Sequence, residues 1–365
     1  MVVSALRYLP FVARGLVKAG PPLHLTVYVT GVCNLRCRHC FHFEEVAAAK
    51  RGPTVEEVEK LAASTERMGP LVWVSFGGGE PMLRRELPEL AEAFGRRGLR
   101  HLAIPTNGLV EPTQHGTVDA ILEACPETFL SLAVSIDGPP EVHDRIRDEE
   151  GAHARALASL DAYLEQARER GRDRLGVGLI VTLTAENQET LATHVEELVR
   201  QHRPDNVTIN LARGTALDES LLEVDLAAYR RLVETKERLM AEGLLGYFDF
   251  PLARLAVARD RRMYRYVEAV ARGRDDYRPC TAGRLSAVVF EDGEVHPCEL
   301  LGRSLGSLAD HDWDLARLWE SRRAEELRTE IHATRCRCTW ECAQADNVLF
   351  HPPDWPGLAL EALRG

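Results

Sequence analysis

Three closely spaced cysteines, Cys33, Cys37 and Cys40, carry the clearest chemistry in this chain. They follow an apolar segment that predicts a strand over residues 23–30. Three thiolates on one short loop can hold three irons of a [4Fe–4S] cluster, a group that normally takes four cysteines. The remaining iron would be open to a ligand other than protein, which indicates catalysis rather than electron storage.

A zinc ion is the alternative occupant of this loop, with His39 or His42 as the fourth ligand. Structural zinc sites are usually assembled from two pairs of ligands, and no second pair lies nearby in the sequence. The spacing therefore favours an iron–sulfur cluster and leaves zinc as the second hypothesis.

A glycine-rich segment follows the next predicted strand, at residues 71–76. Its residues are Gly77, Gly78, Gly79 and Glu80, followed by Pro81. Because glycine has no side chain, backbone carbonyls here can approach a cationic ammonium closely, and Glu80 can assist electrostatically or brace the loop. The alternative is a tight turn in which an acidic residue caps a helix that starts at the proline.

Polar side chains also follow two later predicted strands. Asn107 lies in a Thr-Asn-Gly turn, and Ser135 and Asp137 end the fourth strand. A hydroxyl and a carboxylate can both hydrogen-bond a diol, whereas a simple turn built on Asp137 is the alternative. Arg145 and Arg147 can pair with a carboxylate, and surface charge is their alternative role.

Strands and helices alternate through the first two thirds of the chain. Strands are predicted over residues 23–30, 71–76, 101–105, 129–136, 175–183 and 206–211. Helices are predicted over residues 54–68, 85–97, 118–124, 153–170, 190–202 and 225–242, the first with Thr54 and Glu57 as a capping box. Six such units predict an α/β fold, a partial (β/α)6 barrel with a parallel sheet. Because parallel strands end at one rim, the loops described above should converge there.

A small cysteine-rich α+β module is predicted from about residue 251 onward. A helix is expected over 254–272, a hairpin over 285–296 and a second helix over 313–330. The five cysteines of this module are Cys280, Cys298, Cys336, Cys338 and Cys342. Their clustering indicates metal ligands rather than a disulfide framework, with a zinc ribbon as the alternative.

The first loop resembles the signature of the radical S-adenosylmethionine (SAM) superfamily, C-x₃-C-x-Φ-C, in which Φ is usually aromatic and is His39 here. The glycine segment is similar to that superfamily's GGEP segment, which binds the amino group of SAM. The segment around Ser135 and Asp137 resembles its fourth strand, near the ribose hydroxyls, and Asn107 is a further candidate contact. The resemblance implies that one electron cleaves SAM to methionine and a 5′-deoxyadenosyl radical, which takes a hydrogen atom from substrate.

The later cysteines resemble the SPASM and twitch extensions of the same superfamily. The segment from Cys280 to Cys298 fits the pattern C-x₉₋₁₅-G-x₄-C, and Cys338 and Cys342 fit its closing pair. The full SPASM pattern has seven cysteines and two clusters, so the five here imply one auxiliary [4Fe–4S] cluster. Its firmer ligands would be Cys280, Cys298 and Cys342, with Cys336 or Cys338 as the fourth. A three-ligand cluster that binds substrate directly is the alternative.

Composition and charge restrict the partners. The formal net charge of −11 argues against a general nucleic-acid partner. No apolar run of about 18 residues predicts a transmembrane helix, and residues 1–20 lack a signal-peptide pattern, so a cytoplasmic location is expected. The resemblance implies an external one-electron donor such as flavodoxin or ferredoxin.

Three regions are expected: an N-terminal extension (1–22), the barrel (23–250) and the auxiliary cluster domain (251–365). SPASM-type extensions occur on peptide maturases and on enzymes that oxidise or epimerise small molecules. Post-translational modification of a peptide is the favoured function, ahead of oxidation or epimerisation of a sugar, alcohol or lipid. A non-catalytic iron–sulfur or zinc protein is the opposing class, which the intact cysteine loop and Glu80 disfavour.

Overall fold

Nine strands form one sheet in the computed structural model, which describes residues 8–17, 22–110, 116–250, 252–274 and 277–364. The strand order is β6-β5-β4-β3-β2-β1-β7-β8-β9. The first six strands are β1 (His24–Thr30), β2 (Trp73–Gly78), β3 (His101–Thr106), β4 (Phe129–Ser135), β5 (Leu175–Leu183) and β6 (Val207–Leu211). They are parallel and lie in chain order, which confirms the predicted α/β fold.

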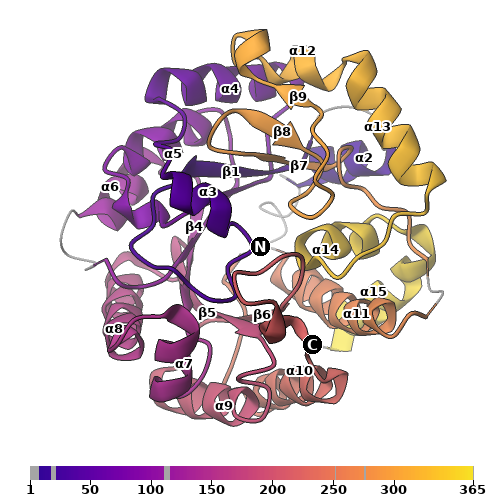
Figure 1. Cartoon of the computed structure of the whole chain (residues 1–365). Helices are drawn as coiled ribbons and strands as arrows, with labels where there is room; N and C mark the ends of the chain where they lie inside the picture. The colour runs from indigo at the N-terminus through magenta and orange to yellow at the C-terminus, as the bar shows by residue number, and fades with distance from the viewer. Residues whose placement is uncertain (1–7, 18–21, 111–115, 251, 275–276, 365) are drawn as a thin grey trace.

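Helices connect these strands and surround the sheet on its outer side (Figure 1). They are α3 (Phe43–Ala48), α4 (Val55–Met68), α5 (Leu87–Gly95), α6 (Thr117–Ala124), α7 (Pro140–Arg147), α8 (Ala152–Arg170), α9 (Leu191–His202) and α10 (Leu226–Ala241). The expected capping box starts α4: the Thr54 hydroxyl accepts the Glu57 N–H, and the Glu57 carboxylate accepts the Thr54 N–H at 2.7 Å. The short helices α3 and α7 are additions that the sequence pattern did not predict.

The C-terminal hairpin extends the barrel sheet instead of forming a sheet of its own. β7 (Ser286–Val289) pairs in parallel with β1, and β8 (Glu294–His296) and β9 (Gly306–Ser307) continue antiparallel from it. An outer strand without a neighbour leaves backbone N–H and C=O groups unpaired, and β7 pairs those of β1. The later cysteines are therefore joined to the strand that leads into the first cysteine loop.

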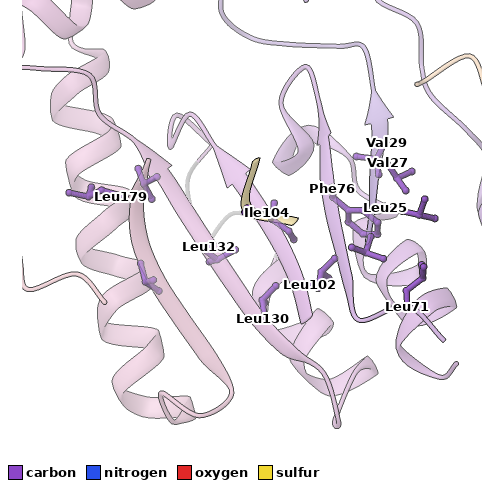
Figure 2. Close-up of a cluster of buried hydrophobic side chains, with 14 of the residues drawn as sticks. Leu25, Val27, Val29, Leu71, Phe76, Leu102, Ile104, Leu130, Leu132 and Leu179 are labelled. Carbon is purple, nitrogen blue, oxygen red and sulfur yellow. The ribbon is translucent and has the colours of Figure 1, made fainter. Parts of the chain in front are cut away.

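Alternate residues of the parallel strands form the main hydrophobic core with the covering helices. Leu25, Phe76 and Leu102 are fully buried on three neighbouring strands, and Leu61 and Leu90 join them from α4 and α5. Figure 2 shows the strand side chains of this cluster, which follow one another across the sheet. Burial of this apolar surface is the main term that stabilises the fold.

The strand residues that alternate with this core face the barrel interior, and the strand register arranges them in layers. The first layer consists of His24, Trp73, His101 and Phe129, which are neighbours across β1 to β4. Their rings contact one another, with Trp73 stacked on His101 at a centroid distance of 5.4 Å, and fill the amino end of the barrel. The next layer consists of the small residues Thr26, Ser75, Ala103, Ser131 and Gly176. Bulky side chains thus occupy the floor, and small ones lie between the floor and the rim.

Helix α2 (Leu9–Val17) covers the amino end of the barrel from outside. The Tyr8 hydroxyl and the His101 ring nitrogen Nε2 are 2.7 Å apart, and Arg14 donates to the Pro70 carbonyl at 2.7 Å. Residues 1–7 and 18–21 of the expected N-terminal extension lie outside the described residues.

The remaining helices flank the C-terminal hairpin. α11 (Ala253–Ala271), α14 (Glu341–Leu349) and α15 (Trp355–Arg364) pack side by side (Figure 1). The helix expected over 313–330 is instead two helices, α12 (Leu315–Trp319) and α13 (Arg322–Ala333). Ser321 marks the break, because its hydroxyl accepts the Ala324 N–H and caps α13. None of the described helices combines the length and the apolar character needed to cross a membrane.

The substitution Leu102→Ala should lower the free energy of unfolding by about 2–5 kcal/mol, because Leu102 is fully buried in β3 and its removal leaves a cavity. Leu360→Ala is the matched control, since Leu360 is 49% exposed on α15, and it should change that free energy by less than about 0.5 kcal/mol. Urea unfolding of the purified chain measures both values. Equal losses in the two variants would contradict the placement of Leu102 in the core.

Candidate functional site

The loops after β1, β2 and β4 meet at the carboxyl ends of the strands, as a parallel sheet requires. The cysteine loop spans residues 31–42 and is tied by backbone hydrogen bonds to the loop after β2 and to helix α7, which follows the loop after β4. The Glu80 N–H donates to the Val32 carbonyl at 2.9 Å, and the Arg38 N–H donates to the Ile146 carbonyl at 2.9 Å. The predicted convergence of these segments at one rim is therefore observed.

The three thiols of this loop are free, half-buried and within electrostatic reach of one another. Burial raises the pKa of Cys33 to about 11 and also raises the pKa values of Cys37 and Cys40. Metal binding here must therefore displace protons from the sulfur atoms. Across the described residues, no three His, Cys, Asp or Glu side chains are grouped closely enough to hold a single metal ion. Three thiols on one loop are the donor set that a larger iron–sulfur cluster with an open iron requires.

His39, the residue at the Φ position, is enclosed between the cysteine loop and the loop after β4. Its Nε2 atom lies 3.9 Å from an Asp137 carboxylate oxygen, and burial lowers its pKa to about 4. Its Nδ1 atom is buried and has no hydrogen-bond partner among the described residues. Because buried polar atoms are usually paired, this nitrogen fits a bound group next to the thiols.

The glycine segment packs backbone against backbone on the start of the cysteine loop. Gly78 has a φ of +120°, and a Cβ there would lie 2.0 Å from the Thr30 carbonyl oxygen. A Cβ on Gly79 would lie 2.2 Å from the Val32 carbonyl oxygen. Both positions therefore exclude a side chain. Gly77 is less restricted, since its nearest neighbour would be the ring of Tyr28 at 3.3 Å.

Glu80 braces the rim from within. Its residue is 2% exposed, and its carboxylate accepts the Met82 N–H at 3.0 Å, the Thr106 hydroxyl at 2.8 Å and the Asn107 N–H at 2.7 Å. Burial raises the pKa of Glu80, while these donors favour its charged form. Of the two roles that the sequence allowed, the contacts support the brace between the loops after β2 and β3.

Asn107 joins the loop after β3 to the cysteine loop. Its Nδ2 group donates to the side-chain oxygen of Asn34 at 2.7 Å, and its own side-chain oxygen accepts the Leu109 N–H at 2.9 Å. Asn107 is buried and therefore fixes the cysteine loop in place as much as it offers a contact to a ligand.

Ser135 and Asp137 differ in how far their side chains are already engaged. Asp137 is fully buried; one carboxylate oxygen accepts two N–H groups of Arg147, and the other accepts the Thr182 N–H at 2.8 Å. The guanidinium of Arg147 lowers the pKa of Asp137 despite burial. Ser135 is half-buried, and its hydroxyl has no hydrogen-bond partner in the described parts of the chain. The geometry favours Ser135 over Asp137 as a ribose contact, which stays a prediction for both.

The two arginines of α7 have different environments. Arg147 is 8% exposed and is held by Asp137, whereas Arg145 is on the surface and pairs with Glu186 at 2.7 Å. The sequence offered pairing with a carboxylate and surface charge as alternatives. Both arginines pair with a carboxylate, Arg147 in the interior and Arg145 at the surface. The prolines that open α7 were the available sign of this helix, since proline is favoured in a first helical turn.

Four of the five later cysteines gather at the C-terminal hairpin. Cys280 shares a hydrogen bond with Cys336, which raises the pKa of Cys280, and Cys298 lies within electrostatic reach of Cys336 and Cys338. Cys342 has solvent-exposed surface, but burial of its thiol raises its pKa to about 12, and the thiol lies within electrostatic reach of Glu299, Arg213 and Glu341. Both Cys336 and Cys338 therefore lie near Cys280 and Cys298. Which four of the five cysteines bind a cluster stays a prediction.

Buried polar residues that the sequence did not predict lie between the two cysteine groups. The Tyr28 hydroxyl donates to the Glu299 carboxylate at 3.1 Å, and Arg213 pairs with Glu341. Burial raises the pKa values of both glutamates. His42, next to the first cysteine group, contacts Tyr28 edge-on at 4.7 Å between ring centroids. Two signals could have indicated these residues: Tyr28 is at an inward position of β1, and Glu299 follows Cys298 directly.

Comparison with known proteins identifies two matching family models. The Radical SAM superfamily model matches residues 27–198, and the SPASM model, an iron–sulfur cluster-binding domain, matches residues 280–343. These segments contain the first cysteine group and the later cysteines, respectively.

Similar proteins include enzymes with different substrates in their names. Fe-coproporphyrin III synthase of Methanosarcina barkeri is 26% identical over 338 residues, which cover 86% of this chain and 79% of that protein. PqqA peptide cyclase of Rhizobium meliloti is 32% identical over 148 residues, covering 40% of this chain and 37% of that protein.

Among solved structures, Streptococcus suis SuiB bound to precursor peptide SuiA aligns with a TM-score of 0.62 and 14% identity, covering 89% of this chain and 70% of that one. At this identity the likeness concerns the fold, a mostly parallel sheet followed by a C-terminal module. Together with the two family matches, these findings show that the chain belongs to the radical SAM superfamily and carries a SPASM iron–sulfur cluster-binding domain.

Proposed function

We propose that this protein modifies a peptide by abstracting a hydrogen atom in a SAM-dependent reaction, with Cys33, Cys37 and Cys40 holding the [4Fe–4S] cluster that binds SAM. The observation that carries the proposal is the contact between two loops at the carboxyl ends of the strands: the three thiols share one loop, and that loop packs directly on the glycine segment. When bound, the cluster and SAM supply one-electron cleavage of SAM and hydrogen-atom abstraction.

The side chains of the rim divide into those that offer a contact and those that hold the contacts in place. Glu80 and Asp137 are fully engaged with protein donors, so we assign them to positioning. The groups that remain available for SAM are the His39 ring, the Ser135 hydroxyl and the backbone of Gly77, Gly78 and Gly79. The Asn107 amide, already bonded to Asn34 and Leu109, is a further candidate contact only through its second N–H. The convergence of these groups lets the chain orient SAM and exclude water from it.

One auxiliary [4Fe–4S] cluster is proposed for the later cysteines. Cys336 and Cys338 lie within electrostatic reach of both Cys280 and Cys298, which supports a four-thiolate set, and Cys342 is the alternative ligand. Because β7 pairs with β1, this group is held at a fixed position relative to the first loop. A cluster here would accept an electron from the substrate or position it, and flavodoxin or ferredoxin would supply the electron for SAM.

The charge between the two cysteine groups favours a peptide over a polycarboxylate substrate. Glu299, Glu341 and Glu291 are enclosed there, and the charge of Arg213 is engaged by Glu341. Such a region suits a neutral or cationic side chain, whereas negative groups would be repelled. The Glu299 carboxylate, whose pKa is raised by burial, can accept the proton that substrate oxidation releases.

A tetrapyrrole is the second candidate substrate. It is favoured by the match with Fe-coproporphyrin III synthase, which extends over 86% of this chain. The carboxylates of such a substrate would need cationic partners. Arg213, which lies within electrostatic reach of Cys338 and Cys342, already pairs with Glu341. A peptide therefore fits the observed charges better.

The proposed activity is tested with anaerobically reconstituted, reduced protein. It should convert SAM to 5′-deoxyadenosine, with reduced flavodoxin or ferredoxin as the electron source, and should change the mass of a precursor peptide encoded beside its gene. Absence of 5′-deoxyadenosine, with zinc in place of iron in the purified chain, would contradict the enzyme assignment. Turnover of a tetrapyrrole but of no peptide would replace the first candidate with the second.

Replacement of Cys33, Cys37 and Cys40 together by alanine should halve the iron content, from about eight to about four atoms per chain, because the auxiliary cluster has separate ligands. Iron and sulfide analysis after anaerobic reconstitution measures this change. Cys125→Ala is the control, since this buried cysteine lies beside Gly95 of α5, has Glu92 and Arg174 as its electrostatic neighbours, and should leave the iron content unchanged. Complete loss of iron in the triple variant would refute an independent auxiliary site.

The substitution Glu299→Gln should separate SAM cleavage from substrate modification. Removal of a proton acceptor typically lowers the catalysed step about 10²–10⁴-fold, so modified product should fall by that order while 5′-deoxyadenosine still forms. Glu326→Gln, on the exposed surface of α13, is the control and should leave both products unchanged. Parallel loss of both products in the Glu299 variant would argue against the assigned role.

A further inference from the structure

The guanidinium of Arg147 links the loop after β4 to a sulfur atom of the first cysteine group. Its Nε and Nη2 groups donate to one carboxylate oxygen of Asp137 at 2.9 and 2.6 Å. Its Nη1 group lies 3.8 Å from the Cys37 Sγ, within hydrogen-bond distance of a sulfur acceptor. Among the described residues, Cys37 is the one partner of this nitrogen that the structure records.

Asp137 is itself held from several directions, so the guanidinium has little freedom to move. Its second carboxylate oxygen accepts the Thr182 N–H at 2.8 Å, its own N–H donates to the His143 ring at 3.0 Å, and its carbonyl accepts the Asn187 amide at 2.8 Å. A positive charge fixed in this way is pre-oriented toward the sulfur, without a cost of reorganisation when the charge on the sulfur changes.

The contact with Cys37 is not needed to attach helix α7 to the cysteine loop. The Arg38 N–H already donates to the Ile146 carbonyl at 2.9 Å, and His143 ties α7 to the end of β4 through the Asp137 N–H. The carboxylate binds the Nε–Nη2 edge of the guanidinium, which leaves Nη1 as the end of the ion pair directed at Cys37. An interaction with the Cys37 sulfur atom accounts for this orientation of the guanidinium.

We propose that Arg147 is a positioning residue that tunes the redox potential of the SAM-binding cluster by donating an N–H···S hydrogen bond to Cys37. The inference rests on the assignment of Cys37 as a ligand of that cluster. Reduction adds one negative charge to the cluster, and a nearby cation with a hydrogen bond to a ligand sulfur stabilises the reduced form. Arg147 therefore makes the cluster easier to reduce, which is the step that an external donor must drive.

The test is the midpoint potential of the SAM-responsive cluster, followed by electron paramagnetic resonance in the reconstituted full chain. Arg147→Gln should lower this midpoint potential by at least about 59 mV. For one electron, that shift is a tenfold fall in the ratio of reduced to oxidised cluster at a fixed potential. The cluster at the first loop is distinguished from the auxiliary cluster because SAM alters only the spectrum of the former.

Arg145→Gln is the matched control, since it removes an exposed arginine from the same helix and should leave the potential unchanged. Arg147→Lys covers the case in which the glutamine variant loses its cluster: an ammonium can keep the ion pair with Asp137 but does not reach two partners as a guanidinium does. The midpoint potential of the cluster in the lysine variant should also fall.

Equal midpoint potentials in the unaltered chain and in an Arg147 variant that retains its cluster would overturn the inference. Failure of the proposed function would look different, because the unaltered chain would then show no SAM-responsive cluster at all.

Discussion

The buried carboxylate of Glu80 is the interaction on which the rim of this barrel depends. It accepts hydrogen bonds from Met82, Thr106 and Asn107, so one side chain fixes the ends of two strands. Its own N–H donates to Val32 and thereby ties the same point to the cysteine loop. An unpaired carboxylate at this depth would be strongly destabilising. Because the Glu80 carboxylate is fully paired, it holds these loops rigidly together, and the groups assigned to SAM are arranged around it.

The glycines beside it show how close backbone packing and chemistry are combined. Gly78 and Gly79 let the two loops approach to a distance that any side chain would prevent, so the cysteine loop has no room to shift toward β2. Deeper in the barrel, aromatic rings fill the floor and small residues line the layer above it. The fold thus confines its reactive groups to one end of the sheet.

Much of this site could be predicted from the sequence, because its signals are local. The cysteine spacing, the glycine run and the alternation of strands and helices each lie within a short segment. The partners of these residues could not be predicted, because they are distant in the chain: Tyr28 and Glu299 are 271 residues apart, and Arg147 reaches Cys37 across 110 residues. Asp137 illustrates the difference, since its position was predictable but its engagement by Arg147 depends on an unpredicted helix.

The pairing of β7 with β1 also has a consequence for biosynthesis. β1 leaves the ribosome long before β7, the strand that completes its outer edge. Until then the barrel exposes an open edge of backbone donors and acceptors, which is a template for unwanted association between nascent chains. Such a long-range closure is slow to form. Fragments that end before β7 would keep this edge open permanently, so the C-terminal module also protects the barrel from aggregation.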